Sequence, residues 1–188
     1  TAIKALAEYL GEEDDIEDFD SDSETFPRNG DPITVYGPGG AEYMVFKDHN
    51  DAYKYGVVMV QEQIDDDPTS FTPSWLQSHY FLSDIDRRLI AQDMSEVDYE
   101  EYDTEEEAEQ AGEDLYNQNY NELERDPWGF FEDMGMDPTK HMYIDARAAA
   151  EDAVDTDGLG HFLSGYDGEE MELGMGFTVP AYAFKTQG

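Results

Sequence analysis

The sequence predicts an α+β fold in a single domain that spans residues 1–188, and three observations support this. Hydrophobic residues make up 39% of the chain and aromatic residues 13%, which is enough to build one core of ordinary size. Runs rich in β-branched and aromatic residues lie toward both ends, and segments with helical periodicity lie between them. This order is typical of N- and C-terminal β-hairpins that form a small antiparallel sheet packed with several amphipathic helices. A subdivision of the domain near 95–100 stays open.

The first elements expected are a short helix and a hairpin. Apolar residues at helical spacing begin at Ile3, and Gly11 can end this helix in a left-handed conformation. Strands over 33–36 and 43–47 flank a glycine-rich turn at 37–40, which is the pattern of a β-hairpin.

Between this helix and the hairpin lies an acidic segment, 12–31, which we expect to be mobile. Nine of the thirteen residues over 12–24 are acidic. The motif DFDSDS at 18–23 has the spacing of the first ligands of an EF-hand calcium loop, but serine stands at the sixth position and asparagine at the twelfth. The loop requires glycine and glutamate there, so a calcium-dependent interaction module is kept only as an alternative.

Further helices are expected in the middle of the chain. Asp48 can cap a helix that runs to about Ile64, and Pro73 suits the first position of a short one. The aromatic residues of the turn at 126–131 should enter the core.

Another helix should begin at Ser83, whose hydroxyl can cap it together with Asp86. Arg87 and Arg88 in this helix form one of the few basic clusters, for which we expect ion pairs with nearby carboxylates. Its inward face should carry the apolar residues Ile85, Leu89, Ile90 and Met94.

The stretch 96–133 combines sixteen acidic residues and one basic residue with many aromatic ones. Thr104 and Glu107 form a capping box at the start of a helix over 104–124. One buried stripe of this helix should consist of Ala108, Ala111, Leu115, Asn119 and Leu123. Another face should carry Glu106, Glu109 and Glu113, where like charges roughly 5–6 Å apart repel. Folding does not require this arrangement, since alternating glutamate and lysine would stabilise the helix.

The C-terminal part should contain a helix over 145–154 and the clearest hairpin of the chain, over 161–173 with its turn at 167–168. A third strand is expected over 177–184. Pro180 should place this strand at an edge or a bulge, because proline cannot donate a hydrogen bond to a neighbouring strand.

The formal net charge is −37, which predicts a strongly acidic surface. To stay soluble, a small domain needs a net charge of only roughly 2–8 in magnitude. Either the partner is strongly basic, or the solvent is so salty that repulsion is screened within about 3 Å at 1 M. A negative potential of this size repels nucleic acid and anionic membranes, and it attracts proteins with lysine- and arginine-lined grooves. Direct binding to nucleic acid or to membranes is therefore disfavoured.

Signals for catalysis are weak. The chain has no cysteine, and its four histidines do not have paired ligand spacing. Ser164 lacks the glycine two positions earlier that a nucleophile elbow needs. No run is long and apolar enough for a signal peptide or a membrane-spanning helix. We expect a soluble protein with no enzymatic activity, no cofactor and no metal site.

The stretch 143–173, YIDARAAAEDAVDTDGLGHFLSGYDGEEMEL, looks like short acidic proteins of bacteriophages. Its YID…AEDA…DG pattern resembles the C-terminal part of ArdA-type antirestriction proteins. In character the whole chain is similar to the DNA-mimic class that includes ArdA and Ocr, being acidic and rich in Tyr, Trp and Phe. The resemblance implies a phage-encoded inhibitor in the host-cell cytoplasm, whose carboxylates replace DNA phosphates. Its partner would be a basic nucleic-acid-binding protein, such as a restriction, CRISPR or other defence nuclease.

The carboxylates expected to imitate phosphates are Glu100, Glu101, Asp103, Glu105, Glu106, Glu109, Glu113 and Asp114. A secondary patch is expected at Glu12, Glu13, Asp14 and Asp15. The sequence leaves open whether the chain forms a homodimer. The alternatives are a halophilic or structural acidic protein without DNA mimicry, and the calcium-dependent module.

Overall fold

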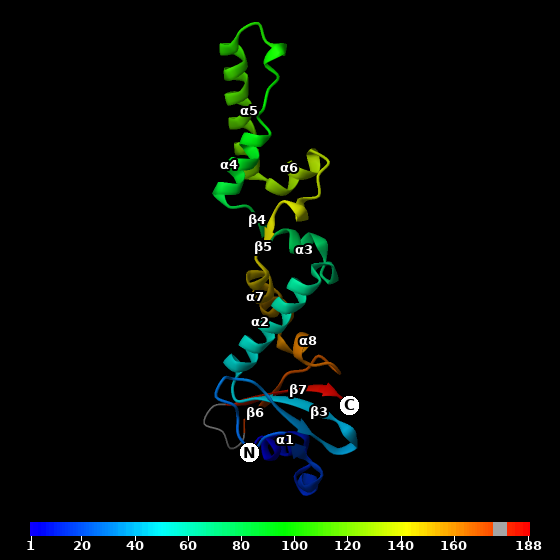
Figure 1. Cartoon of the computed structure of the whole chain (residues 1–188). Coiled ribbons are helices and arrows are strands. Elements are labelled where there is room, and N and C mark those ends of the chain that lie inside the picture. The colour runs from blue at the N-terminus through cyan, green and yellow to red at the C-terminus, as the bar shows by residue number, and fades with distance from the viewer. Residues whose placement is uncertain (175–179) are drawn as a thin grey trace. The chain divides into compact units, whose positions relative to one another are not determined.

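The chain divides into two compact units in a computed structural model that describes residues 1–174 and 180–188 (Figure 1). The first unit consists of Thr1–Phe71 and Ala146–Gly188, and the second, Thr72–Asp145, is inserted between them. The sequence predicted a single domain and left a subdivision near 95–100 open. The observed boundaries lie elsewhere because the inserted residues have a hydrophobic core of their own.

A five-stranded antiparallel sheet organises the first unit. Its spatial order is β1 (Asp20–Ser21), β2 (Ile33–Tyr36), β3 (Glu42–Phe46), β7 (Ala181–Gln187) and β6 (Met171–Leu173). The predicted N-terminal hairpin is confirmed, since Ile33 pairs with Val45. N- and C-terminal strands join where β3 pairs with β7. The prediction of a small antiparallel sheet packed with several helices, an α+β fold, is therefore confirmed.

Helices lie on both faces of this sheet, with α1 on one side and α2 and α8 on the other (Figure 1). The helices of this unit are α1 (Ala2–Leu10), α2 (His49–Asp66), α7 (Ala146–Asp157) and α8 (Leu159–Leu163). Leu6 packs with Val35 and Val45 in the core beneath α1. On the opposite face Phe46 meets Tyr55 of α2 with ring centroids 5.3 Å apart. Successive residues of a strand point to opposite faces of the sheet, so the neighbours Val45 and Phe46 contact α1 and α2 respectively.

The acidic segment contains local structure. A 3₁₀ helix, η1, covers Glu13–Asp18, and Phe19 after it is buried in the core. Two carboxylates of the DFDSDS motif accept backbone hydrogen bonds, Asp20 from Ser21 at 2.8 Å and Asp22 from Thr34 at 3.0 Å. These hydrogen bonds order the end of the acidic segment where it joins the sheet. The mobility of 12–31 as a whole stays a prediction.

The expected hairpin over 161–173 is wrong. Its first half lies partly in the helix α8, because Leu159 and Leu163 are both buried at a spacing of four residues. β6 pairs with β7 instead. The edge position expected from Pro180 is also wrong, since this residue precedes β7, an interior strand with β3 and β6 on its two sides. The expected strand residues 177–179 lie outside the described part of the chain.

The second unit is mainly helical. Its elements are α3 (Pro73–Gln77), β4 (Tyr80–Phe81), α4 (Asp84–Asp93), η4 (Tyr99–Glu101), α5 (Glu105–Arg125), α6 (Pro127–Asp133), η5 (Pro138–Lys140) and β5 (Tyr143–Ile144). β4 and β5 pair antiparallel, with Tyr80 opposite Ile144 and Phe81 opposite Tyr143. The stretch predicted as a turn at 126–131 lies mostly in the helix α6. Its residues Phe130 and Phe131 lie in the core, and Trp128 packs against it half-buried, so the predicted inward position of the aromatic residues is confirmed.

The prediction of which α4 residues face inward is partly wrong. Ser83 caps the helix as predicted, accepting a hydrogen bond from the Asp86 amide at 3.1 Å. Ile85 and Leu89, however, are 70% and 59% exposed. The inward residues are Ala91, which is buried, and Ile90 and Met94, which are half-buried. Ile85 and Leu89 lie off this stripe and face solvent.

Candidate functional site

Helix α5 positions most of the predicted site residues. The Thr104 hydroxyl accepts a hydrogen bond from the Glu107 amide at 3.2 Å, as the capping box predicted. Ala108 and Leu123 are fully buried, and Asn119 donates a hydrogen bond to the Met94 carbonyl at 3.1 Å. Three of the five residues predicted for the buried stripe, Ala108, Asn119 and Leu123, are thus buried, whereas Ala111 and Leu115 are half-buried. The stripe sets the rotation of α5 so that its glutamates point outward.

The carboxylates predicted to imitate phosphates are all exposed, and we call them the acidic band: Glu100, Glu101, Asp103, Glu105, Glu106, Glu109, Glu113 and Asp114. They come from η4, the turn after it and the first half of α5, which lie together at one end of the second unit (Figure 1). Within the described residues, Asp114 alone of the eight carboxylates is engaged, by Gln110 Nε2 at 2.9 Å. The others are available to a partner.

The secondary patch belongs to the first unit. Glu13, Asp14 and Asp15 are exposed on η1, and Glu12 before it is half-buried. The two predicted sets of carboxylates thus lie on different units.

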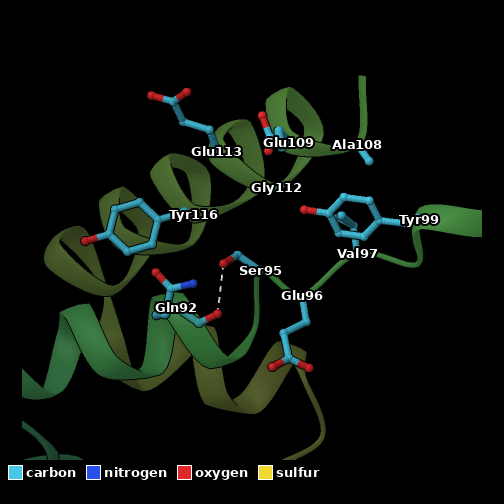
Figure 2. A pocket seen from close by; sticks show the side chains of 10 residues that line it. All are labelled: Gln92, Ser95, Glu96, Val97, Tyr99, Ala108, Glu109, Gly112, Glu113 and Tyr116. Carbon is cyan, nitrogen blue, oxygen red and sulfur yellow. Dashed lines mark hydrogen bonds between the residues drawn. The ribbon is translucent and has the colours of Figure 1, made fainter. Parts of the chain in front are cut away.

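A groove of about 610 Å³ lies beside the acidic band, between α5 and the residues that follow α4. Tyr99 and Tyr116 stand at its two ends, with Gly112 between them (Figure 2). A Cβ atom at Gly112 would lie 3.5 Å from the Ser95 carbonyl oxygen and 3.8 Å from Val97. A larger side chain at this position would therefore enter the groove.

Three glutamates, Glu96, Glu109 and Glu113, are among the residues that line the groove, and the carboxylates of Glu96 and Glu113 point outward (Figure 2). None of them takes part in a hydrogen bond or ion pair with any residue that the structure describes. Glu109 and Glu113 were predicted as site residues, whereas Glu96 and the two tyrosines were not. The sequence contained one signal for this groove, Gly112. Glycine inside a helix costs about 1 kcal/mol relative to alanine, so its presence there calls for a structural reason.

An ion-pair and hydrogen-bond network fixes α4 against α5. Asp84 lies 2.9 Å from Arg88 and 3.8 Å from Arg87, which confirms the expected ion pairs. Tyr120 of α5 donates a hydrogen bond to Asp84 at 2.7 Å. This hydrogen bond, together with the charge of Arg88, lowers the pKa of Asp84. The same hydrogen bond, together with burial and the negative charge of Asp84, raises the pKa of Tyr120.

Replacing Tyr120 with phenylalanine should raise the pKa of Asp84 toward its ordinary value, as ¹³C NMR titration of the carboxyl group can measure. In the wild type the folded pKa lies below the unfolded one, so this contribution to stability is present above the ordinary aspartate pKa and is lost as the pH falls through the folded value. Tyr116→Phe is the control, because Tyr116 stacks on Tyr120. An equal shift in both variants would contradict the assignment.

Ser164, which the sequence analysis considered as a nucleophile, has a structural role. Ser164 Oγ lies 2.8 Å from the Asp167 carboxylate and 2.9 Å from the Lys185 carbonyl oxygen, and so links α8 to β7. Over residues 1–174 and 180–188, no group of three or more histidine and acidic side chains could hold a metal ion. Over the same residues, no helix has both the length and the apolar character needed to cross a membrane.

Comparisons with protein-family models, with curated proteins and with solved structures each found no match to this chain.

Proposed function

We propose that this chain is a phage-encoded inhibitor that mimics DNA and occupies the basic nucleic-acid-binding groove of a host defence nuclease or another DNA-binding protein. The observation that carries the proposal is the acidic band, an exposed set of carboxylates held on a capped and packed helix. In this mechanism no covalent bond is made or broken.

The charge density of α5 supports the proposal. Six of the ten residues over 105–114 are acidic. With a rise of about 1.5 Å per residue, they carry one charge per about 2.5 Å of helix axis. Duplex DNA carries one per about 1.7 Å. Glu100, Glu101 and Asp103, from the preceding turn, add to this density.

Packing supports the proposal as well. A flexible acidic tail loses conformational entropy when it binds, at about 0.5–1.5 kcal/mol for each immobilised side chain, in addition to the backbone. The backbone of α5 is already ordered by its cap at Thr104, by buried Leu123 and by the hydrogen bond from Asn119. Only the side chains of the acidic band remain to be ordered.

The experiment that tests the proposal begins with capture of proteins from a nuclease-treated bacterial lysate on the immobilised chain, with elution by rising salt. Each captured protein is then purified and bound to a fluorescent DNA duplex. Adding the chain should release the duplex, seen as a fall in anisotropy. The affinity of the partner for the chain, measured without DNA, should weaken by about 10³-fold or more between 50 and 200 mM salt if six or more charges are matched.

A captured protein that keeps its duplex in the presence of excess chain would contradict the proposal. Circular dichroism in dilute buffer supplies the control. A chain that folds only near about 1 M salt would instead favour the halophilic explanation, in which screening is what the acidic residues require.

A further inference from the structure

We infer that the groove between Tyr99 and Tyr116 accepts an arginine side chain of the partner protein. The inference rests on the proposed function and specifies it, because it names the residue that the partner inserts. The groove is a hollow with a tyrosine ring at each end and three glutamates among its lining residues, two of which belong to α5 and to the acidic band.

The lining of the groove favours a cation. Its charged residues are Glu96, Glu109 and Glu113, and no basic residue lines it. Pockets for small organic ligands are mostly apolar and usually hold a few convergent polar groups. Three carboxylates instead repel anions and attract a positive group. The volume of about 610 Å³ is ample for one long side chain.

The aromatic rings favour arginine over lysine. Tyr99 is 54% exposed, and Tyr116 is half-buried on α5, so both offer a ring at the groove surface. A planar guanidinium group stacks on aromatic rings and binds a carboxylate through two parallel hydrogen bonds, whereas the more strongly hydrated ammonium group of lysine does neither as well. The carboxylates of Glu96 and Glu113 point outward at the rim (Figure 2). As exposed side chains they rotate within nanoseconds and can close on the bound group.

Gly112 makes the inference testable without a change in charge. Because a Cβ atom there meets Ser95 and Val97 at ordinary contact distances, alanine fits, and leucine would extend into the groove. Both residues also favour a helix more than glycine does. Gly112→Leu should therefore obstruct the middle of the groove, between the two tyrosines, while it keeps every carboxylate, with Gly112→Ala as the matched control.

The first test is NMR titration of the full chain with N-acetylarginine amide. Saturable shifts confined to the amides around Val97, Gly112 and Tyr116 are expected, about tenfold weaker with N-acetyllysine amide and lost in Gly112→Leu. Equal binding of both amides, or shifts spread over all acidic segments, would overturn the inference.

The second test is release of duplex DNA from the captured partner by each variant. Gly112→Leu should release the duplex about tenfold less well than Gly112→Ala, the size expected for one stacked, charge-assisted contact. Tyr99→Leu, which removes an exposed ring, should show a similar loss with an unchanged circular dichroism spectrum. If wild type and Gly112→Leu release the duplex equally, the arginine site fails and the proposed function stands. If no variant releases it while the arginine amide still binds, the proposed function fails instead.

Discussion

Replacing Glu105, Glu106, Glu109 and Glu113 together with glutamine should weaken release of duplex DNA from the partner by about 10⁴-fold. Double-mutant cycles at one strongly charged interface give coupling energies of about 1.5–7 kcal/mol for close charge pairs, and four pairs at the lower value amount to about 6 kcal/mol. The fold should survive. The loss of favourable helix-dipole interactions in the first turn, about 0.3–1 kcal/mol each, is offset in part by relief of repulsion between glutamates three and four residues apart. Circular dichroism checks the fold, and the anisotropy assay measures release.

The matched control removes the same number of charges elsewhere. Glu62, Asp65, Asp66 and Asp157 are exposed in the first unit, and within the described residues none of these carboxylates forms a hydrogen bond or an ion pair. Changing them to glutamine or asparagine gives a variant of equal net charge, which should release the duplex nearly as well as the wild type. If both variants lose release equally, net charge and not the acidic band determines binding.

Replacing Gly160 with alanine should destabilise the first unit by about 3 kcal/mol or more. A Cβ atom at this position would lie 2.1 Å from the carbonyl oxygen of Gly168, a backbone atom that cannot move aside as a side chain does. Overpacking of a well-packed site typically costs about 1–3 kcal/mol, and backbone contact places this case at the upper end. Denaturant unfolding followed by far-UV circular dichroism should show the first unit unfolding at a lower concentration.

Gly174→Ala is the control for this substitution. Among residues 1–174 and 180–188, no atom lies within 4 Å of a Cβ built at Gly174, so the effect of this substitution on the free energy of unfolding should stay within about 0.5 kcal/mol. Equal stability of the two variants would show that the approach of Gly160 to Gly168 is not needed for folding.

Elements with local signals were predicted from the sequence. Asp48, Ser83 and Thr104 each accept the expected capping hydrogen bond, because a cap depends on residues only three positions apart. The hairpin over 33–47 has a similarly local cause, a glycine-rich turn between two strands of matched length. The exposure of the acidic band was predicted as well, since the buried stripe of α5 leaves its glutamates on the remaining faces.

Features that depend on distant residues were not predicted. The Asp167–Gly168 turn suggested a hairpin, but the partner of β6 is β7, which comes after it in the chain. Gly160 and its contact with Gly168 carry no periodic signal, because the requirement for glycine comes from the approach of another backbone segment.

The groove was missed for the same reason. Tyr99 and Tyr116 are far apart in the sequence, and only the packing of α5 against the end of α4 places them at one hollow. The secondary patch on η1 lies on the other unit from the acidic band, which amino-acid counts alone do not reveal. The groove therefore depends on the fold, whereas the acidic band depends mainly on one helix.

The inserted unit, Thr72–Asp145, interrupts the first unit, so the chain connects the two units at two places, before Thr72 and after Asp145. Both tryptophans, Trp75 and Trp128, belong to this insert, so intrinsic tryptophan fluorescence monitors the insert, while circular dichroism monitors the whole chain. Each unit has its own interior, so the two signals should diverge during melting, and a single transition temperature would then misdescribe the molecule.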